Sequence, residues 1–163
     1  YDSAIQAKVE RMTKRLIDNG RPAEILLVDD NRGDALLARH ALREASFATN
    51  LTVAQTGEIA IAILRGEGDH TGRRLPDLVL LDLQLPQMSG LDVLSVIKSD
   101  ERTAHIPVIV MSNSGAGQNV MTSYRLHASA YVVKPIDIGK YREAIALMEQ
   151  FFFVLATLAV AEA

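Results

Sequence analysis

The sequence predicts an α/β protein built on a doubly wound, five-stranded parallel sheet. Short aliphatic runs alternate along the chain with longer segments of helical period. The aliphatic runs lack polar alternation, which is typical of parallel strands covered by helices on both faces. Because crossovers between parallel strands are right-handed, few topologies remain, and we expect the strand order 2-1-3-4-5.

The five predicted strands are aliphatic runs, most of which end in a polar or charged residue. In chain order they are EILLVDD at 24–30, NLTVAQ at 50–55, DLVLLD at 77–82, PVIVMS at 107–112 and AYVVK at 130–134. Runs of this length are typical of strands.

The segments between the strands have the period of amphipathic helices. The first, at 34–46, gathers Leu36, Leu37 and Leu42 towards one side, and Gly66 ends the second. A polar loop is expected at 67–76. The five predicted helices lie at 34–46, 56–66, 90–101, 117–129 and 137–152.

Both ends of the chain lie outside this alternation. Residues 1–20 form a predicted helical extension, since the apolar residues of 4–17 follow a 4-3-4 spacing. The main domain is expected at 23–150. The apolar extension at 151–163 predicts a homodimer interface, because exposed apolar patches mark partner surfaces. The alternative is a helix extension that folds onto its own domain.

Composition excludes several classes of function. The 163 residues suffice for one domain, and a net charge of −3 with a pI near 5.8 argues against nucleic-acid or membrane-surface binding. The chain has no cysteine, which excludes disulfides and thiolate chemistry. Its longest apolar run, 151–161, is shorter than the roughly 20 residues of a membrane span. No signal peptide is visible, so we expect a cytoplasmic protein.

Polar side chains stand where four of the strands end. Asp29 and Asp30 end the first strand, Asp82 the third, Ser112 the fourth and Lys134 the fifth. Each alone could be a helix cap or a turn residue. The carboxyl ends of parallel strands share one edge of the sheet, however, so we expect the five side chains to converge there.

Three carboxylates at one edge require positive charge. Two carboxylates about 4 Å apart repel by roughly 4 kcal/mol at an effective dielectric of about 20. Oxygen ligands at a solvent-accessible site suit Mg²⁺, which together with Lys134 would balance the three aspartates. Asp82 could then attack a phosphoryl donor and form an aspartyl phosphate, with the Ser112 hydroxyl bonding a phosphoryl oxygen.

This ordered set resembles the receiver domain of two-component response regulators over about 23–150. The matching motifs are DD at 29–30, LLDLQLPQMSG around Asp82, VIVMS ending at Ser112 and AYVVKP carrying Lys134. The resemblance implies the flavodoxin-like receiver fold and a phosphorelay protein with a sensor histidine kinase as partner. Its output would be a changed dimer surface or transfer to a downstream phosphotransfer protein, without a DNA-binding domain.

The resemblance also implies roles for individual residues at the metal. Asp82 would be the phosphoacceptor. Asp30 and Asp82 would bind Mg²⁺ directly, Asp29 would bind it through water, and the backbone carbonyl of Gln84 would complete the protein ligands.

Two further positions receive roles from the resemblance. Ser112 and Lys134 would contact the phosphoryl group. Tyr131 matches the aromatic residue that swings inward when the hydroxyl residue moves towards phosphate. Its alternative interpretation is a half-buried strand tyrosine.

Three segments narrow the resemblance to single-domain response regulators that partner bacterial phytochromes. They are SYRLHASAYVVKP at 123–135, the loop at 66–76 and MEQFFFVLATL at 148–158. The chain departs from that group at Asp29-Asp30, often Glu-Asp there, at Asn31-Arg32, often Asn-Pro, and in a tail without proline.

Two other functions compete with the phosphoacceptor. A phosphohydrolase of the haloacid-dehalogenase kind also uses an aspartate nucleophile, Mg²⁺ and a lysine, but it needs a second aspartate at the position of Gln84. A phosphate-independent pseudo-receiver would have no need for all five polar residues. We therefore expect a signalling protein whose only catalysis is its own phosphorylation and dephosphorylation.

Overall fold

The computed structural model of the chain describes residues 21–44, 48–134 and 137–152. Its strands are β1 (Ala23–Val28), β2 (Thr49–Ala54), β3 (Leu78–Asp82), β4 (Val108–Ser112) and β5 (Ala130–Val133). Its helices are α2 (Arg32–Arg43), α3 (Gly57–Arg65), α4 (Gly90–Ser99), α5 (Gly117–Arg125) and α6 (Ile138–Gln150). Every strand and helix predicted between 24 and 152 is present, with ends shifted by a few residues.

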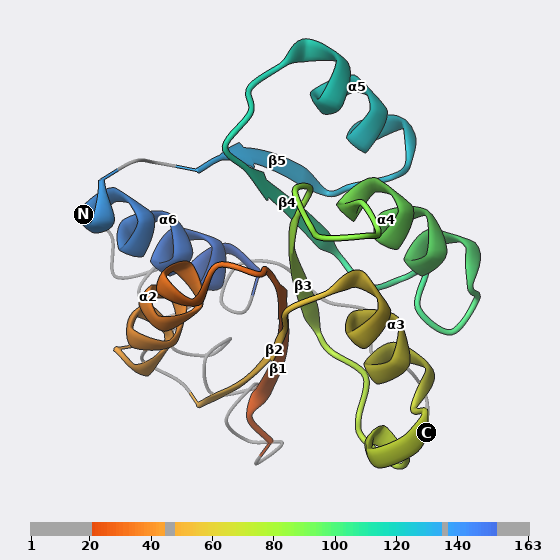
Figure 1. Ribbon diagram of the computed structural model, residues 1–163. Coiled ribbons are helices and arrows are strands. Elements are labelled where there is room, and N and C mark those ends of the chain that lie inside the picture. Colours follow the sequence, from red (N-terminus) through yellow and green to blue (C-terminus); the bar gives the residue numbers. More distant parts are fainter. Residues whose placement is uncertain (1–20, 45–47, 135–136, 153–163) are drawn as a thin grey trace, which may run out of the picture.

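The five strands form one parallel sheet in the order β2-β1-β3-β4-β5, which confirms the predicted topology. Helices α2 and α6 cover one face, and α3, α4 and α5 cover the other (Figure 1). The register aligns Val28 with Leu81, so Asp29 and Asp82, one residue further on, leave the sheet at the same level.

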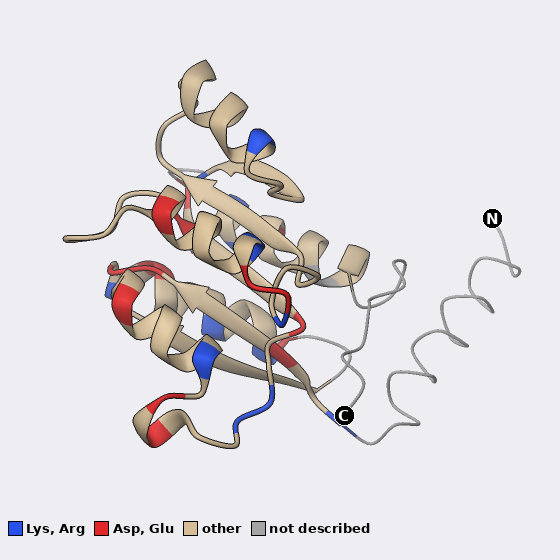
Figure 2. Ribbon diagram, turned by 90° about the vertical axis from the view of Figure 1, so that its right-hand side faces the viewer, with Lys and Arg blue, Asp and Glu red and all other residues tan. Residues whose placement is uncertain are grey.

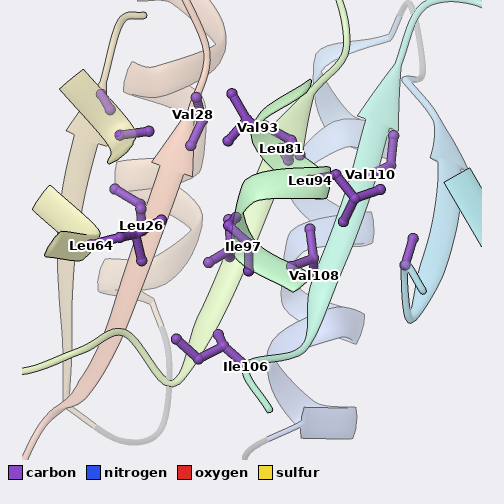
Figure 3. Close-up of a cluster of buried hydrophobic side chains, with 14 of the residues drawn as sticks. Leu26, Val28, Leu64, Leu81, Val93, Leu94, Ile97, Ile106, Val108 and Val110 are labelled. Atoms are coloured by element: carbon purple, nitrogen blue, oxygen red, sulfur yellow. The ribbon is translucent and has the colours of Figure 1, made fainter. Parts of the chain in front are cut away.

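Two apolar clusters hold the helices to the sheet. Alternate residues of each central strand belong to different clusters: in β1, Leu26 packs towards α3 and α4 (Figure 3), whereas Leu27 packs towards α2 and α6. Both faces of β3 and β4 are fully buried. This explains why their sequences are continuously aliphatic, as expected for covered parallel strands.

The same alternation governs the residues at the strand ends. Asp29, Asp82 and Lys134 each stand two residues after a strand residue that packs in the cluster under α2 and α6. Successive side chains of a strand point to opposite faces, so these three residues share the face covered by α2 and α6. Ser112 and Tyr131 stand at positions of the opposite alternation.

The terminal predictions are largely untested. Residues 1–20 and 153–163 lie outside the described residues, and with them the N-terminal helix and most of the apolar extension. Two residues of that extension are described: Phe152 packs against the cluster under α2 and α6, whereas Phe151 is 54% exposed. None of the helices in the described ranges is long and apolar enough to cross a membrane.

One segment differs from its prediction. The loop expected at 67–76 contains a turn of 3₁₀ helix, η1 (Gly68–His70). The Thr71 hydroxyl donates to the carbonyl oxygens of Gly66, at 3.2 Å, and Gly68, at 2.8 Å. These side-chain bonds close the turn. The sequence does not predict it, because the segment has no apolar periodicity.

Gly90 is where α4 touches the end of β3. A Cβ atom there would lie 2.1 Å from the carbonyl oxygen of Asp82 and 2.6 Å from Cα of Leu83. The Gly90 N–H also donates to the Leu83 carbonyl at 3.0 Å. Backbone atoms cannot move aside as a flexible side chain does, so only glycine fits this contact.

We predict that Gly90→Ala lowers the free energy of unfolding by about 1–3 kcal/mol, the usual cost of overpacking. The measurement is urea denaturation followed by circular dichroism. Gly117→Ala is the matched control, since a Cβ atom at this helix start meets nothing within 4 Å. Equal unfolding midpoints for the two variants would contradict the steric argument.

Candidate functional site

Lys134 lies at the centre of the site and contacts three carboxylates. Its Nζ donates to Oδ2 of Asp29 at 2.7 Å, of Asp34 at 2.9 Å and of Asp82 at 3.0 Å. The lysine side chain is only 4% exposed. An ammonium group has three hydrogens to donate, so this lysine is fully engaged.

Asp29 and Asp82 are each held a second time by the backbone. Oδ1 of Asp29 accepts from the N–H of Asn31 at 2.9 Å, and Oδ1 of Asp82 accepts from the N–H of Gln84 at 3.0 Å. Each aspartate thus closes a turn onto the backbone two residues ahead. The contact that Gln84 makes is through its N–H, and its predicted role as a carbonyl ligand stays a prediction.

Asp34 is a site residue that sequence reasoning missed. The sequence pattern predicts it as the first residue of a helix, whereas α2 begins at Arg32 with Asn31 as the N-cap, which accepts from the Asp34 N–H at 3.1 Å. Acidic residues are common in the first turn of a helix, because their negative charge interacts favourably with the helix dipole. Asp34 therefore does not stand out in the sequence. The sequence feature that could have identified Asp34 as a site residue is its position in the first helical turn after β1, next to the carboxyl end of that strand.

The charge balance predicted from the sequence therefore needs correction. Three aspartates, one lysine and one Mg²⁺ would sum to zero, but the structure adds the carboxylate of Asp34. The site brings together four carboxylates and a single lysine, which contacts three of them, so the formal charge stays negative even with a divalent cation in place.

Three of the four aspartates form a candidate metal cluster. Asp29, Asp30 and Asp82 each offer one oxygen, and these oxygens lie within 4.8 Å of one another. Figure 2 shows acidic residues, in red, at the arrowhead ends of strands. Asp30 is exposed and makes no hydrogen bond or ion pair with other described residues, so its oxygens are accessible. An all-oxygen set of this kind fits Mg²⁺ or Mn²⁺.

Burial and the ion pairs act in opposite directions on the pKa values of Asp29 and Lys134. Burial raises the pKa of the Asp29 carboxyl, and the hydrogen bond from Lys134 only partly offsets that effect. Burial alone would lower the pKa of Lys134, but the carboxylates of Asp29, Asp34 and Asp82 outweigh it and raise that pKa. The lysine therefore stays charged, while the charge of ionised Asp29 is only partly compensated, and a cation would supply the rest.

Ser112 and Tyr131 form a second part of the site. Ser112 is buried, and its Oγ accepts from the N–H of Ser114 at 3.2 Å. Tyr131 is half-buried, and its hydroxyl donates to the Ser114 carbonyl oxygen at 2.5 Å. Both side chains thus contact the loop between β4 and α5, and neither hydroxyl bonds the lysine ammonium or a carboxylate of the described aspartates. Ser112 meets Lys134 through the backbone, where its carbonyl oxygen accepts from the Lys134 N–H at 2.7 Å. The predicted swing of Tyr131 stays a prediction.

Comparison with known proteins agrees with this arrangement. The family model "Response regulator receiver domain" matches residues 25–146. Response regulator Rcp1 of Synechocystis sp. is 31% identical over 144 residues, which cover 88% of this chain and 98% of Rcp1.

Solved structures agree as well. The phosphorylated cyanobacterial phytochrome response regulator RcpA is 35% identical with a TM-score of 0.84, over 86% of this chain and 100% of RcpA. The Mn²⁺-bound form of Rcp1 is 32% identical with a TM-score of 0.81, over 85% of this chain and 100% of the other. With the aspartate cluster, the buried lysine and the five-stranded sheet in place, this chain belongs to the response regulator receiver domain family.

Proposed function

We propose that the chain is a phosphoacceptor that takes a phosphoryl group on Asp82 from a sensor histidine kinase. The observation that carries the proposal is the position of the Asp82 carboxylate, between the ammonium of Lys134 at 3.0 Å and the other members of a three-aspartate cluster. Phosphorylated RcpA, a relative of similar fold, supports it.

The chemical step transfers the phosphoryl group from nitrogen to oxygen. A carboxylate oxygen of Asp82 attacks phosphorus and forms a P–O bond, the P–N bond to the kinase histidine breaks, and its electron pair returns to the imidazole nitrogen. Lys134 donates to an equatorial phosphoryl oxygen as negative charge gathers there. The Gln84 N–H holds the acceptor carboxylate in place throughout.

A divalent cation is part of this proposal. Mg²⁺ held by Asp29, Asp30 and Asp82 would supply positive charge beside the phosphoryl oxygens, and the Mn²⁺-bound Rcp1 structure supports such a site. The Ser112 hydroxyl would turn from the Ser114 N–H to bond a phosphoryl oxygen. Tyr131 would follow into the space that this movement opens.

The partner that we propose is a bacterial phytochrome with histidine kinase activity. The two proteins would meet in the cytoplasm, where ATP supplies phosphoryl groups to the kinase. RcpA is a phytochrome response regulator, and it aligns with most of this chain.

We further propose a homodimer that uses the exposed side of α6. Leu147 and Phe151 are 61% and 54% exposed and stand four residues apart, on one side of the helix. The output would be either a change of the dimer surface or transfer of the phosphoryl group to a downstream phosphotransfer protein.

The first prediction concerns phosphorylation. Incubation with acetyl phosphate or phosphoramidate and Mg²⁺ should add one phosphoryl group per chain in intact-mass spectrometry. Asp82→Asn should remove this addition, because an amide oxygen cannot replace the carboxylate as nucleophile. Asp69→Asn, an exposed aspartate of η1, is the matched control and should be phosphorylated like the parent.

Other outcomes of this experiment separate the competing functions. Repeated turnover of p-nitrophenyl phosphate would favour a phosphohydrolase, and absence of any addition would favour a pseudo-receiver. Unchanged phosphorylation of Asp82→Asn would refute the assignment of the acceptor.

The second prediction concerns the metal. Mg²⁺ at a hundred times its dissociation constant should raise the free energy of unfolding by about 2.7 kcal/mol. Asp30→Asn should abolish most of this gain and leave the metal-free stability unchanged or raised, because Asp30 is exposed, bonds no other described residue and adds negative charge to the metal-free cluster. Urea denaturation with and without Mg²⁺ measures both quantities. An Asp30→Asn protein that keeps the full gain would argue against the cluster as the metal site.

The third prediction concerns the dimer. Light scattering over a concentration series should show dimers of the parent, and Phe151→Ser should shift the protein to monomers. Met121→Ser is the matched control, because Met121 on α5 is also 54% exposed but lies on the other side of the sheet. Phe152 is unsuitable for this test since it packs against its own core. A parent that stays monomeric throughout, or a Phe151→Ser variant that stays dimeric, would contradict the proposal.

A further inference from the structure

Tyr141 carries a buried hydroxyl that the proposed chemistry does not use. The residue is 2% exposed, and its Oη has no hydrogen-bond partner among the described residues. A buried hydroxyl without a partner is costly, and most buried polar groups in proteins are paired. Phenylalanine would fill the same space at α6 without that cost, so the hydroxyl calls for an explanation.

The hydroxyl lies on the side of the sheet that holds the lysine and its carboxylates. Tyr141 is in the first turn of α6, and its ring belongs to the cluster that α2 and α6 share. Asp34 is in the first turn of α2, and the two helices pack side by side (Figure 1). After burial itself, the charge of Asp34 is the largest influence that raises the pKa of Tyr141. The hydroxyl therefore keeps its proton and can donate.

Asp34 is the carboxylate that would lose its only hydrogen-bond donor among the described residues if Lys134 turned from it to a phosphoryl oxygen. All three hydrogens of Lys134 are engaged, so a bond to a phosphoryl oxygen must replace one of its three present bonds. Asp29 keeps its bond from the Asn31 N–H and its place in the metal cluster. The Asp34 side chain lies outside that cluster, and among the described residues Lys134 is its only hydrogen-bond donor.

We infer that the Tyr141 hydroxyl is a positioning group, which donates to the Asp34 carboxylate when Lys134 turns from it to a phosphoryl oxygen on Asp82. The inference rests on the proposed function. In the resting protein Lys134 donates to Asp34 and the Tyr141 hydroxyl has no partner among the described residues. In the phosphorylated protein the hydroxyl replaces the lysine as the donor to Asp34. The exchange would couple Asp82 to α6, the helix that ends directly before Phe151.

The test compares Tyr141→Phe with the parent, with beryllofluoride and Mg²⁺ as the phosphoryl mimic. Loss of a hydrogen bond to a charged group should weaken beryllofluoride binding by about tenfold in titration calorimetry. The metal-free unfolding midpoint should stay unchanged or rise, since the resting hydroxyl has no partner to lose. Ser99→Ala is the control, because the Ser99 hydroxyl at the end of α4 is exposed and bonds no other described residue, so this variant should keep the parent affinity.

Asp34→Asn makes the test specific to the pair. In that background Tyr141→Phe should change beryllofluoride affinity by much less than tenfold, because the charged acceptor is gone. Tyrosine absorbance gives a second readout, unobscured because the chain has no tryptophan. Binding of beryllofluoride should shift the tyrosine absorbance of the parent more than that of Tyr141→Phe, in which only the movement of Tyr131 would contribute.

Several results would overturn the inference. Parent affinity in Tyr141→Phe refutes it and leaves the proposed function intact, whereas a parent that binds no beryllofluoride refutes both. A full tenfold effect in the Asp34→Asn background shows that the hydroxyl acts on another group. A lower metal-free unfolding midpoint for Tyr141→Phe shows that the hydroxyl is already bonded in the resting protein.

Discussion

The ammonium of Lys134 is the interaction on which the rest of the site depends. It joins β5 to β1, β3 and α2 through the carboxylates of Asp29, Asp82 and Asp34. Two of those carboxylates are buried, and an uncompensated charge in such a place costs several kcal/mol. The lysine therefore stabilises the fold and, because it must also meet an incoming phosphoryl group, cannot do both through the same three bonds.

The backbone decides which side chains share that ammonium. Parallel pairing brings Asp29 and Asp82 to one level, and strand alternation turns them and Lys134 to the face under α2 and α6. Ser112 ends its strand with the opposite alternation and contacts its own loop. The site thus has a charged half and a hydroxyl half, on different faces of the same sheet edge. A phosphoryl group on Asp82 would be the first ligand to contact both.

Much of this architecture follows from sequence patterns, for identifiable reasons. Continuous aliphatic runs predict covered strands, and parallel strands bring their carboxyl ends together, so the sequence alone is enough to group Asp29, Asp30, Asp82 and Lys134. Asp34 escapes that grouping, because an acidic residue in a helix's first turn has an ordinary explanation. The hydroxyl of Tyr141 is equally hidden, since an aromatic residue on the apolar side of a helix predicts only packing.

The fourth carboxylate also changes what the site can transmit. With only Asp29, Asp30 and Asp82, a metal and a phosphoryl group could be accommodated by the strand ends, and movement would pass mainly through Ser112 towards α5. Asp34 belongs to α2, so any turn of Lys134 away from it alters a contact between a helix and the sheet. Because α2 and α6 pack against each other, that alteration would be passed to α6, which exposes Leu147 and is followed by the exposed Phe151. Asp34 thus carries the negative charge that one cation cannot balance. Its position on α2 means that loss of its bond to Lys134 would affect the proposed dimer surface.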